Sequence, residues 1–433
     1  MKHVFYMKRM NTRNGKSGPS ITPTTVTLLA LLFITLKIPS LLAAHVETDE
    51  LIYASLTRNL FLHGQYNLVG LPIYETLSPA IYHHPLFHHP PLLPLLMVLF
   101  MWLGIAKWAI VISWIGHFLC IASVAIQCRL ISSVYAGDDR DRYAPWVSWL
   151  PVLAICVDPV LYLISRKIWM DDLMAGLISL SATFGFLAQR SPRAMHYSVA
   201  AGLALGAASL LKVIALAFLP FLVWILYQSG NRGRLAKWRL SGTAMLVCAV
   251  LVLPWFIVFW NTFHALLPWW VFPDDQLIRS NPFIQATVSK PWYYYLKMLP
   301  LACPLVLLGG WGLTQLSARG NRIVAVNAAF CAGYILLMTI TSASSAGFQM
   351  RFLAPAIPGV YVLFGACLLR IPRWRHNLLL IGVLCVVYAS MQVVPYVLNQ
   401  DIDDYFPLWT FVRITVAARG DGPQEAAKTQ AAR

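Results

Sequence analysis

Two acidic residues, Asp49 and Glu50, stand side by side directly after the first long apolar run of the chain. Charge at the end of a hydrophobic segment is costly and needs a physical reason. The residues that follow favour a short helix over 49–63, ended by Gly64. A carboxylate in a half-dry site can have a raised pKa and can take a proton from an attacking hydroxyl. This pair is therefore a candidate for general-base chemistry.

More carboxylates fall in segments that we expect on the same side of a membrane. Asp171 and Asp172 follow an apolar run over 145–164 and a short polar segment. Loops from different spans can converge over one cavity, so these acids are candidates for the same site. The remaining acids of this set are Glu47, Glu75, Asp274 and Asp275.

Two cations, Lys212 and Arg351, supply the opposite charge that group transfer needs. Each lies at the predicted outer end of a membrane span, where it could hold an anionic leaving group. The alternative is a plain interfacial cation whose stem snorkels to the membrane surface. For Lys37, late in the first apolar run, we expect that snorkelling arrangement.

A histidine- and proline-rich segment over 82–92 contains His83, His84, His88 and His89. Four histidines within seven residues could bind a divalent metal ion, assisted by a nearby carboxylate. The alternatives are a hydrogen-bonding cluster that faces substrate and an ordinary interfacial loop. We therefore assign no certain cofactor and keep a divalent metal as the possible one.

Composition indicates an all-α, polytopic membrane protein. Of the 433 residues, 58% are hydrophobic and 12% are charged, against about 25% charged in a soluble domain. Runs of about 20 apolar residues recur, and such runs satisfy their backbone in a bilayer as helices. The net charge of +16 is spread in short clusters between spans, which argues against nucleic acid as a partner.

The apolar runs predict about 11 transmembrane helices, within a range of 10–13. Residues 1–21 form a basic N-terminal tail, 22–398 the membrane domain, and 399–433 a C-terminal tail. The first outer loop, 44–107, contains the 49–63 helix and an interfacial helix over 92–105. With these spans, the basic clusters fall on one side of the membrane. This places the N-terminus in the cytoplasm and the acidic loops outside. The predicted spans are 22–43, 108–134, 145–164, 173–188, two within 196–228, 241–260, one from 291, one ending near 341, 352–369 and 377–398.

The order of these features resembles a known family. Asp49-Glu50, then Tyr53, Arg58 and Gly64, is similar to the first-loop signature of the GT-C membrane glycosyltransferases. The protein O-mannosyltransferase-like and aminoarabinose transferase-like groups are the most similar. Their "(Lys or His)-Pro-Pro-Leu" element resembles 89–92 here. Later matches are Arg166–Asp171, Gly202–Pro220 around Lys212, Pro254-Trp255, Pro291–Tyr294 and Arg351–Pro355.

The resemblance implies an enzyme that moves a hexosyl or pentosyl group from a polyprenyl-phosphate donor, with inversion, at the outer face of a bacterial inner membrane. The acceptor would be a hydroxyl on a glycolipid, a polysaccharide or a protein. Asp49 would be the base, supported by Glu50, with Asp171 as a second catalytic acid. The implied substrate-binding residues are Tyr53, Arg58, His88, His89, Asp172, Lys212 and Arg351.

The sequence also departs from that family. His88-His89 replaces the Glu-Lys pair of aminoarabinose transferases, and Val213-Ile214 follows Lys212 where the family often has Gly-Pro.

The alternative function is a lipid or solute transporter or flippase without catalytic activity. It would place ionisable residues at mid-membrane on broken helices. The candidates are Asp158, which precedes Pro159, and Lys37. Most acids of the chain are predicted outside the spans, which favours chemistry at the membrane surface over transport.

A third hypothesis is a non-catalytic scaffold.

Overall fold

The computed structural model describes residues 31–38, 41, 48–72, 75, 79–135, 149–228, 233–265, 290–307, 321–342, 349–370 and 375–397. Every regular element in these ranges is a helix, which confirms the all-α prediction. The tails 1–21 and 399–433 lie outside the described residues, as do Glu47, Asp274 and Asp275.

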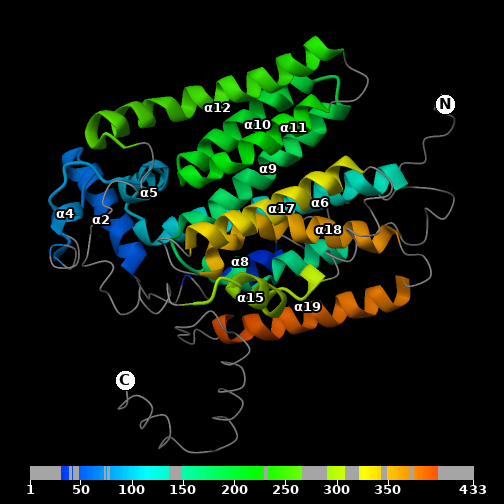
Figure 1. Cartoon of the computed structure of the whole chain (residues 1–433). Coiled ribbons are helices and arrows are strands. Elements are labelled where there is room, and N and C mark those ends of the chain that lie inside the picture. The colour runs from blue at the N-terminus through cyan, green and yellow to red at the C-terminus, as the bar shows by residue number, and fades with distance from the viewer. Residues whose placement is uncertain are drawn as a thin grey trace, which may run out of the picture.

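Long apolar helices lie side by side and form the body of the molecule (Figure 1). They are α6 (Val111–Tyr135), α9 (Met170–Arg190), α12 (Arg234–Phe263), α17 (Arg322–Thr341), α18 (Ile357–Arg370) and α19 (Arg375–Val397). Within the described residues, five helical stretches are long and apolar enough to cross a membrane. They are Trp108–Ser132, Met170–Arg190, Arg234–Phe263, Arg322–Thr341 and Met350–Leu368. The polytopic prediction is confirmed, whereas the count of 11 spans stays a prediction.

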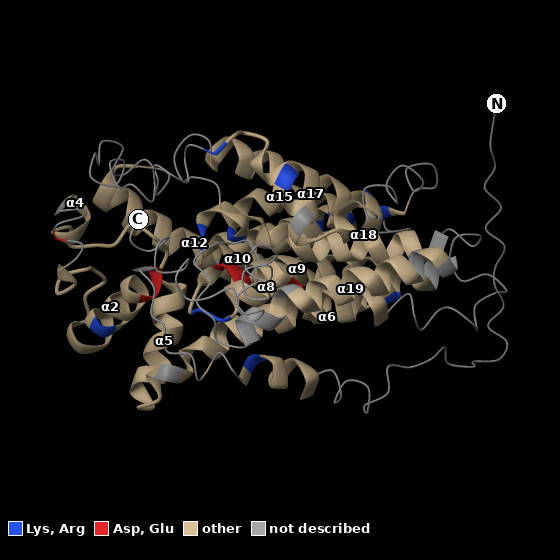
Figure 2. Ribbon diagram, turned by 90° about the horizontal axis from the view of Figure 1, so that it is seen from below, with Lys and Arg blue, Asp and Glu red and all other residues tan. Residues whose placement is uncertain are grey.

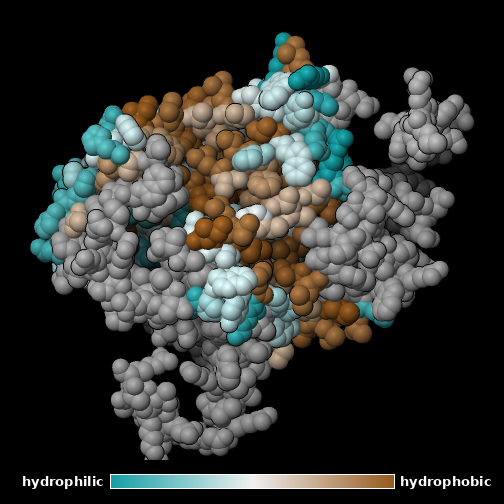
Figure 3. All heavy atoms as spheres, viewed as in Figure 1, coloured by the Kyte–Doolittle hydropathy of each residue, from teal (hydrophilic) through white to brown (hydrophobic). Residues whose placement is uncertain are grey.

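The surface agrees with a membrane setting. Figure 3 shows a broad hydrophobic band between hydrophilic residues at two ends of the molecule. Leu246, Val250 and Leu253 of α12 are exposed on the outside of the bundle. An exposed continuous apolar face of this kind is costly in water and is expected against lipid tails.

The segment 196–228 folds as predicted, with a break at Lys212. Helix α10 (Ala194–Ser209) ends first, and Lys212 then has extended backbone angles. The short 3₁₀ helix η2 (Val213–Phe218) leads into α11 (Leu219–Tyr227), which has a proline in its first turn. Proline is favourable there because that position needs no backbone N–H donor.

The predicted span over 145–164 is not one continuous helix. Residues 149–156 are helical, the chain breaks at 157–158, and α8 (Pro159–Ile164) restarts. Asp158 caps the new helix, because its Oδ1 accepts the Leu161 N–H at 2.9 Å. The next boundary also differs from the prediction: α9 begins at Met170, so Asp171 and Asp172 lie in its first turn and not in a loop.

The first-loop helices gather at one end of the long helices (Figure 1). They are α2 (Thr48–His63), α4 (Pro79–Tyr82), α5 (Leu92–Trp102) and the 3₁₀ helix η1 (Ala106–Ile110). The helices predicted over 49–63 and 92–105 are thus present. Gly64, with φ at +64°, follows α2 directly, in the left-handed conformation that commonly ends a helix. The remaining elements are α15 (Tyr294–Ala302) and the 3₁₀ helix η6 (Met350–Ala356).

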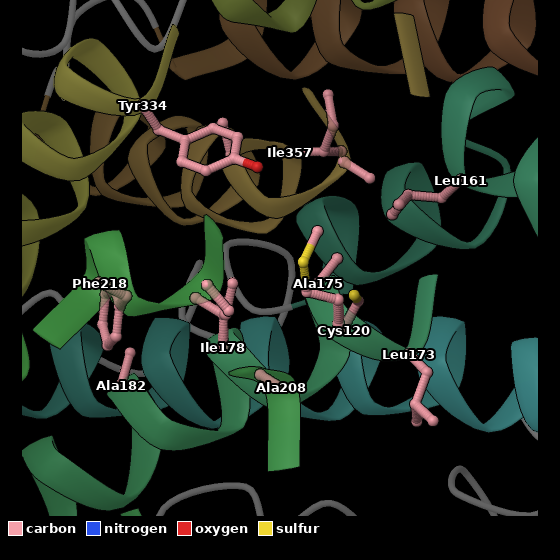
Figure 4. Packing of buried hydrophobic residues seen from close by; sticks show 14 of the residues in the cluster. Cys120, Leu161, Leu173, Ala175, Ile178, Ala182, Ala208, Phe218, Tyr334 and Ile357 are labelled. Carbon is pink, nitrogen blue, oxygen red and sulfur yellow. The ribbon is translucent and has the colours of Figure 1, made fainter. Parts of the chain in front are cut away.

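Helices α6 and α9 approach each other at two glycines. A Cβ on Gly116 would lie 2.3 Å from the Leu173 N atom, and one on Gly176 would lie 2.3 Å from the Gly116 carbonyl oxygen. Small residues allow such close backbone approach between membrane helices. Figure 4 shows the core beside this crossing, where Cys120, Ala175 and Ile357 come from different helices. The crossing fixes the start of α9 against α6.

Gly116→Ala is expected to destabilise the fold, because the new methyl group would overlap the α9 backbone, and overpacking of this kind costs about 1–3 kcal/mol or more. The measurement is the midpoint of thermal unfolding in detergent. The matched control is Gly242→Ala in α12, where a Cβ meets nothing within 4 Å. That change should be neutral or slightly stabilising, because alanine favours a helix. Equal midpoints for the two variants would contradict the tight crossing.

Candidate active site

Helices α2 and α9 begin with the same arrangement of acids. Asp49 and Asp171 are the second residues of their helices, and Glu50 and Asp172 are the third. The N-terminal turn of a helix favours negative charge, because its free N–H groups and its dipole point there. In Figure 2, acidic positions (red) lie near α2 and α9, and most of the ribbon of the long helices is uncharged.

Each of the two second-position aspartates forms an ion pair with a cation from a distant segment. Arg351 Nη1 lies 2.5 Å from Asp49 Oδ2, and Lys212 Nζ lies 2.5 Å from Asp171 Oδ1. Asp171 is 3% exposed, whereas Asp49 is 31% exposed. The two cations therefore point toward carboxylates and do not snorkel away from the protein.

Aromatic rings line the cations. The Arg351 guanidinium carbon lies 4.3 Å from the Trp169 ring centroid and 5.3 Å from that of Phe352. Lys212 Nζ lies 5.2 Å from the Phe352 centroid. Phe352 therefore contacts both cations and links the two ion pairs. Cation–π contacts of this kind add stability in a partly dry site. Sequence reasoning missed Trp169 and Phe352, although both stand beside predicted site residues.

The two carboxyl groups of α2 are in different electrostatic states. Burial raises the pKa of Asp49, but the Arg351 charge and hydrogen bond outweigh that effect, and the pKa ends below its usual value. Burial raises the pKa of Glu50 to about 7, opposed by a hydrogen bond from the Ile168 N–H and assisted by the Asp49 charge. That N–H donates to Glu50 Oε1 at 2.7 Å. Glu50 thus holds the segment before α9, and Asp49 faces the cations.

His89 lies among the two ion pairs, because it interacts electrostatically with Lys212, Asp49 and Asp171. Burial and the Lys212 charge lower its pKa to about 4, so its ring is neutral near pH 7. The Tyr66 hydroxyl, which is held in the core, lies 3.1 Å from the His89 carbonyl oxygen. A neutral imidazole in this position can accept or donate one hydrogen bond to a polar substrate.

The structure places the other predicted binding residues at different distances from the two ion pairs. Tyr53 is buried, and its phenol interacts electrostatically with Asp49, Asp171 and Arg351. His88 is adjacent to His89, with ring centroids 4.4 Å apart. Arg58 is exposed and lies nine residues beyond Asp49 on α2, a rise of about 14 Å. Asp172, next to Asp171 in the first turn of α9, is fully buried.

The four histidines of the 82–92 segment do not share one position. His83 is exposed, and His84 stacks on Phe263 with ring centroids 4.4 Å apart. Across the part of the chain that the structure describes, no group of three or more His, Cys, Asp or Glu side chains is placed to hold a metal ion. His84 Nδ1 lies 2.9 Å from the Leu86 carbonyl oxygen, and the His88 ring packs beside that of His89.

The ionisable residues that motivated the transporter hypothesis are held by the protein itself. Asp158 caps α8 and also accepts a hydrogen bond from the Tyr361 hydroxyl at 2.8 Å. Lys37 is fully buried and bonds to His117 and Ser165. The expectation that Lys37 snorkels outward is wrong, because polar groups inside the bundle satisfy its ammonium.

Known proteins share this arrangement of helices. No protein-family model matches the sequence. ArnT from Cupriavidus metallidurans superposes in the apo state with a TM-score of 0.59 at 19% identity, over 87% of this chain and 66% of that one. Its structure bound to undecaprenyl phosphate gives 0.60 at 20% identity, over 89% and 67%. The archaeal oligosaccharyltransferase AglB from Archaeoglobus fulgidus gives 0.55 at 14% identity, over 87% and 55%. This chain shares the fold of ArnT and AglB.

A curated relative agrees with the fold. The undecaprenyl phosphate-α-4-amino-4-deoxy-L-arabinose arabinosyl transferase 1 of Pseudomonas fluorescens is 25% identical over 281 residues, 54% of this chain. The chain spans about half the length of that relative. In this fold, four residues that the sequence resemblance singled out meet as two ion pairs. They are Asp49, Asp171, Lys212 and Arg351.

Glu50→Gln is expected to gain stability relative to the wild type as pH rises from 5 to 7.5. A carboxyl whose pKa is raised to about 7 in the fold holds its proton while the unfolded chain, with a pKa near 4.5, releases it. The wild-type contribution of Glu50 therefore falls across that window, and glutamine has no such loss while still accepting the Ile168 N–H. The measurement is the difference between the two thermal midpoints at each pH. A difference between the two thermal midpoints that stays constant from pH 5 to 7.5 would contradict the raised pKa of Glu50.

Proposed function

We propose that this protein is a membrane glycosyltransferase that moves a sugar from a polyprenyl-phosphate donor to an acceptor hydroxyl. The observation that carries the proposal is the pair of carboxylate–cation contacts around His89, Asp49–Arg351 and Asp171–Lys212. A base and a phosphate-binding pair are what such a transfer needs. Support comes from relatives named as an undecaprenyl-phosphate aminoarabinose transferase and as an ArnT bound to undecaprenyl phosphate.

Lys212 and Arg351 would hold the donor phosphate. An arginine fork matches two phosphate oxygens at once, and a lysine adds a compact charge. Phe352, which contacts both cations, keeps them at a common surface. Because each cation is already paired with an aspartate, the phosphate would share or displace those carboxylates. The negative charge that develops on the leaving phosphate would then be matched where it forms.

Asp49 would act as the general base. Its exposure of 31% gives an acceptor hydroxyl access that the buried Asp171 does not give. The acceptor oxygen would attack the anomeric carbon while its proton passes to Asp49. The bond between that carbon and the phosphate oxygen would break, and polyprenyl phosphate would leave with the electron pair. Attack from the face opposite the phosphate inverts the anomeric configuration.

Neighbouring side chains would orient these groups. Asp171 would position Lys212, and Glu50 would fix the segment that leads into α9 through its bond to Ile168 N. His89 and Tyr53 would contact the sugar or the phosphate as neutral hydrogen-bonding groups. We place the site at the outer face of a bacterial inner membrane. The acceptor classes are a glycolipid, a polysaccharide and a protein, and the sugar is a pentose or a hexose.

Asp49→Asn is expected to abolish sugar transfer, with a loss of about 10²-fold or more, because the amide cannot take a proton. The assay uses purified protein in lipid nanodiscs with radiolabelled polyprenyl-phosphate sugars offered one at a time, with and without chelator. Asparagine can still accept a hydrogen bond from Arg351, so the size-exclusion profile should match the wild type, and activity is compared per amount of folded protein. Activity above a few per cent of wild type would remove Asp49 from the role of base. Unchanged donor binding with lost turnover would favour the enzyme over the transporter.

Lys212→Ala is expected to weaken binding of polyprenyl phosphate at least tenfold, because it removes one of two cations that face the anion. Binding is measured by titrating the lipid into nanodiscs and following protein fluorescence. The control is Arg234→Ala, which removes an exposed cation at the start of α12. Equal affinity of the two variants for polyprenyl phosphate would contradict a phosphate-binding role of Lys212.

A further inference from the structure

Lys37 is a fully buried cation that reaches the segment before α9. It lies in helical residues 31–38, and none of its surface is exposed. Its Nζ atom lies 3.0 Å from His117 Nδ1 and donates to the Ser165 hydroxyl. The same ammonium lies 4.2 Å from the Tyr162 ring centroid. These contacts join the first helix, α6 and the end of α8.

The hydrogen bonds around Lys37 have one consistent direction. His117 Nε2 lies 2.9 Å from the Ile155 carbonyl oxygen, so this nitrogen carries the proton and donates. Nδ1 is then the acceptor for Lys37. Ser165 Oγ donates to the Tyr162 carbonyl oxygen at 2.9 Å, which leaves its lone pairs to accept from Lys37. The ammonium is therefore held by two directed bonds.

These bonds fix one end of a segment that several other groups also hold. The Ser113 hydroxyl lies 2.7 Å from the Lys167 carbonyl oxygen and 3.1 Å from that of Trp169. Glu50 accepts the Ile168 N–H. The segment 165–169 is thus held by side chains from α2, α6 and the first helix. It ends at Trp169, whose ring contacts Arg351, directly before the helix that carries Asp171.

Ser165 also lies next to the start of α9. Asp172, in the first turn of α9, is fully buried, and the Ser165 hydroxyl lies within hydrogen-bonding reach of its carboxyl. Lys37 thus contacts the segment through Ser165, which faces both the end of α8 and the first turn of α9. A methionine would fill similar space without the desolvation penalty of a buried ammonium. What an ammonium provides is a directed hydrogen bond to Ser165 at the start of the segment.

We propose that Lys37 is a positioning residue, which holds residues 165–172 so that Trp169 and Asp171 meet Arg351 and Lys212. It does not touch the reacting atoms. Its effect on turnover rests on the proposed function, whereas its effect on the segment does not. Loss of its bonds should let the segment open locally, because opening free energy depends on such contacts.

The test measures backbone hydrogen exchange in nanodiscs, on peptides that cover 165–172, for Lys37→Met and Ser165→Ala. Both variants should exchange at least tenfold faster there than wild type, and the double variant should exchange no faster than the faster single one. The matched control is Ser181→Ala, which removes a buried hydroxyl that donates to the Ala201 carbonyl oxygen. It should leave exchange over 165–172 unchanged.

Turnover gives the second readout. Both variants should lower kcat at least fivefold while the KM for the donor changes less than twofold. The donor-binding cations Lys212 and Arg351 lie on other elements, at the start of η2 and in η6, and should stay in place. If Lys37→Met does not fold, Ser165→Ala decides. Wild-type exchange over 165–172 in the folded variants would overturn the proposal. Faster exchange together with no transfer by the wild-type protein would support the positioning role and count against the proposed function alone.

Discussion

The pairing of two helix-start aspartates with two later cations is the interaction on which the site depends. Asp49 and Arg351 are 302 residues apart in the chain, and Asp171 and Lys212 are 41 apart. A charge in a bundle of apolar helices is tolerated only with a partner, because desolvation is otherwise uncompensated. The two pairs therefore require α2, α9, η2 and η6 to meet at one place. The close crossing of α6 and α9 at Gly116 and Gly176 fixes one of these four elements.

The residue types in the site could be read from the sequence, but their pairing could not. Asp49, Asp171, Lys212 and Arg351 stand at ends of apolar runs, where charge is informative on its own. Which acid meets which cation depends on how distant helices pack, and no local pattern encodes that. The fold class was predictable for the converse reason, since apolar runs of about 20 residues restrict the backbone to helices.

The errors in the sequence reading come from two things that a local pattern does not contain, the tertiary partners of a side chain and the start of a helix. Lys37 was expected to snorkel because its position in a span says nothing about His117 and Ser165, which satisfy it from elsewhere. Asp171 and Asp172 were placed in a loop because hydropathy marks where apolar residues begin and not where the helix begins. Arg58 fits a family pattern by spacing and lies on an exposed face of α2, so its substrate-binding role stays a prediction. For Lys37, tertiary contacts decided what local sequence left open.

The ion pairs also connect donor binding to the strength of the base. While Arg351 pairs with Asp49, it lowers the pKa of that carboxyl and makes it a weak base. Under the proposed function, a phosphate that draws the guanidinium away removes the main cause of that lowering, and burial then raises the pKa. Linkage is reciprocal, so a proton on Asp49 would in turn favour phosphate at Arg351. The same two residues would thus make Asp49 basic when a donor is present and keep it inert in its absence.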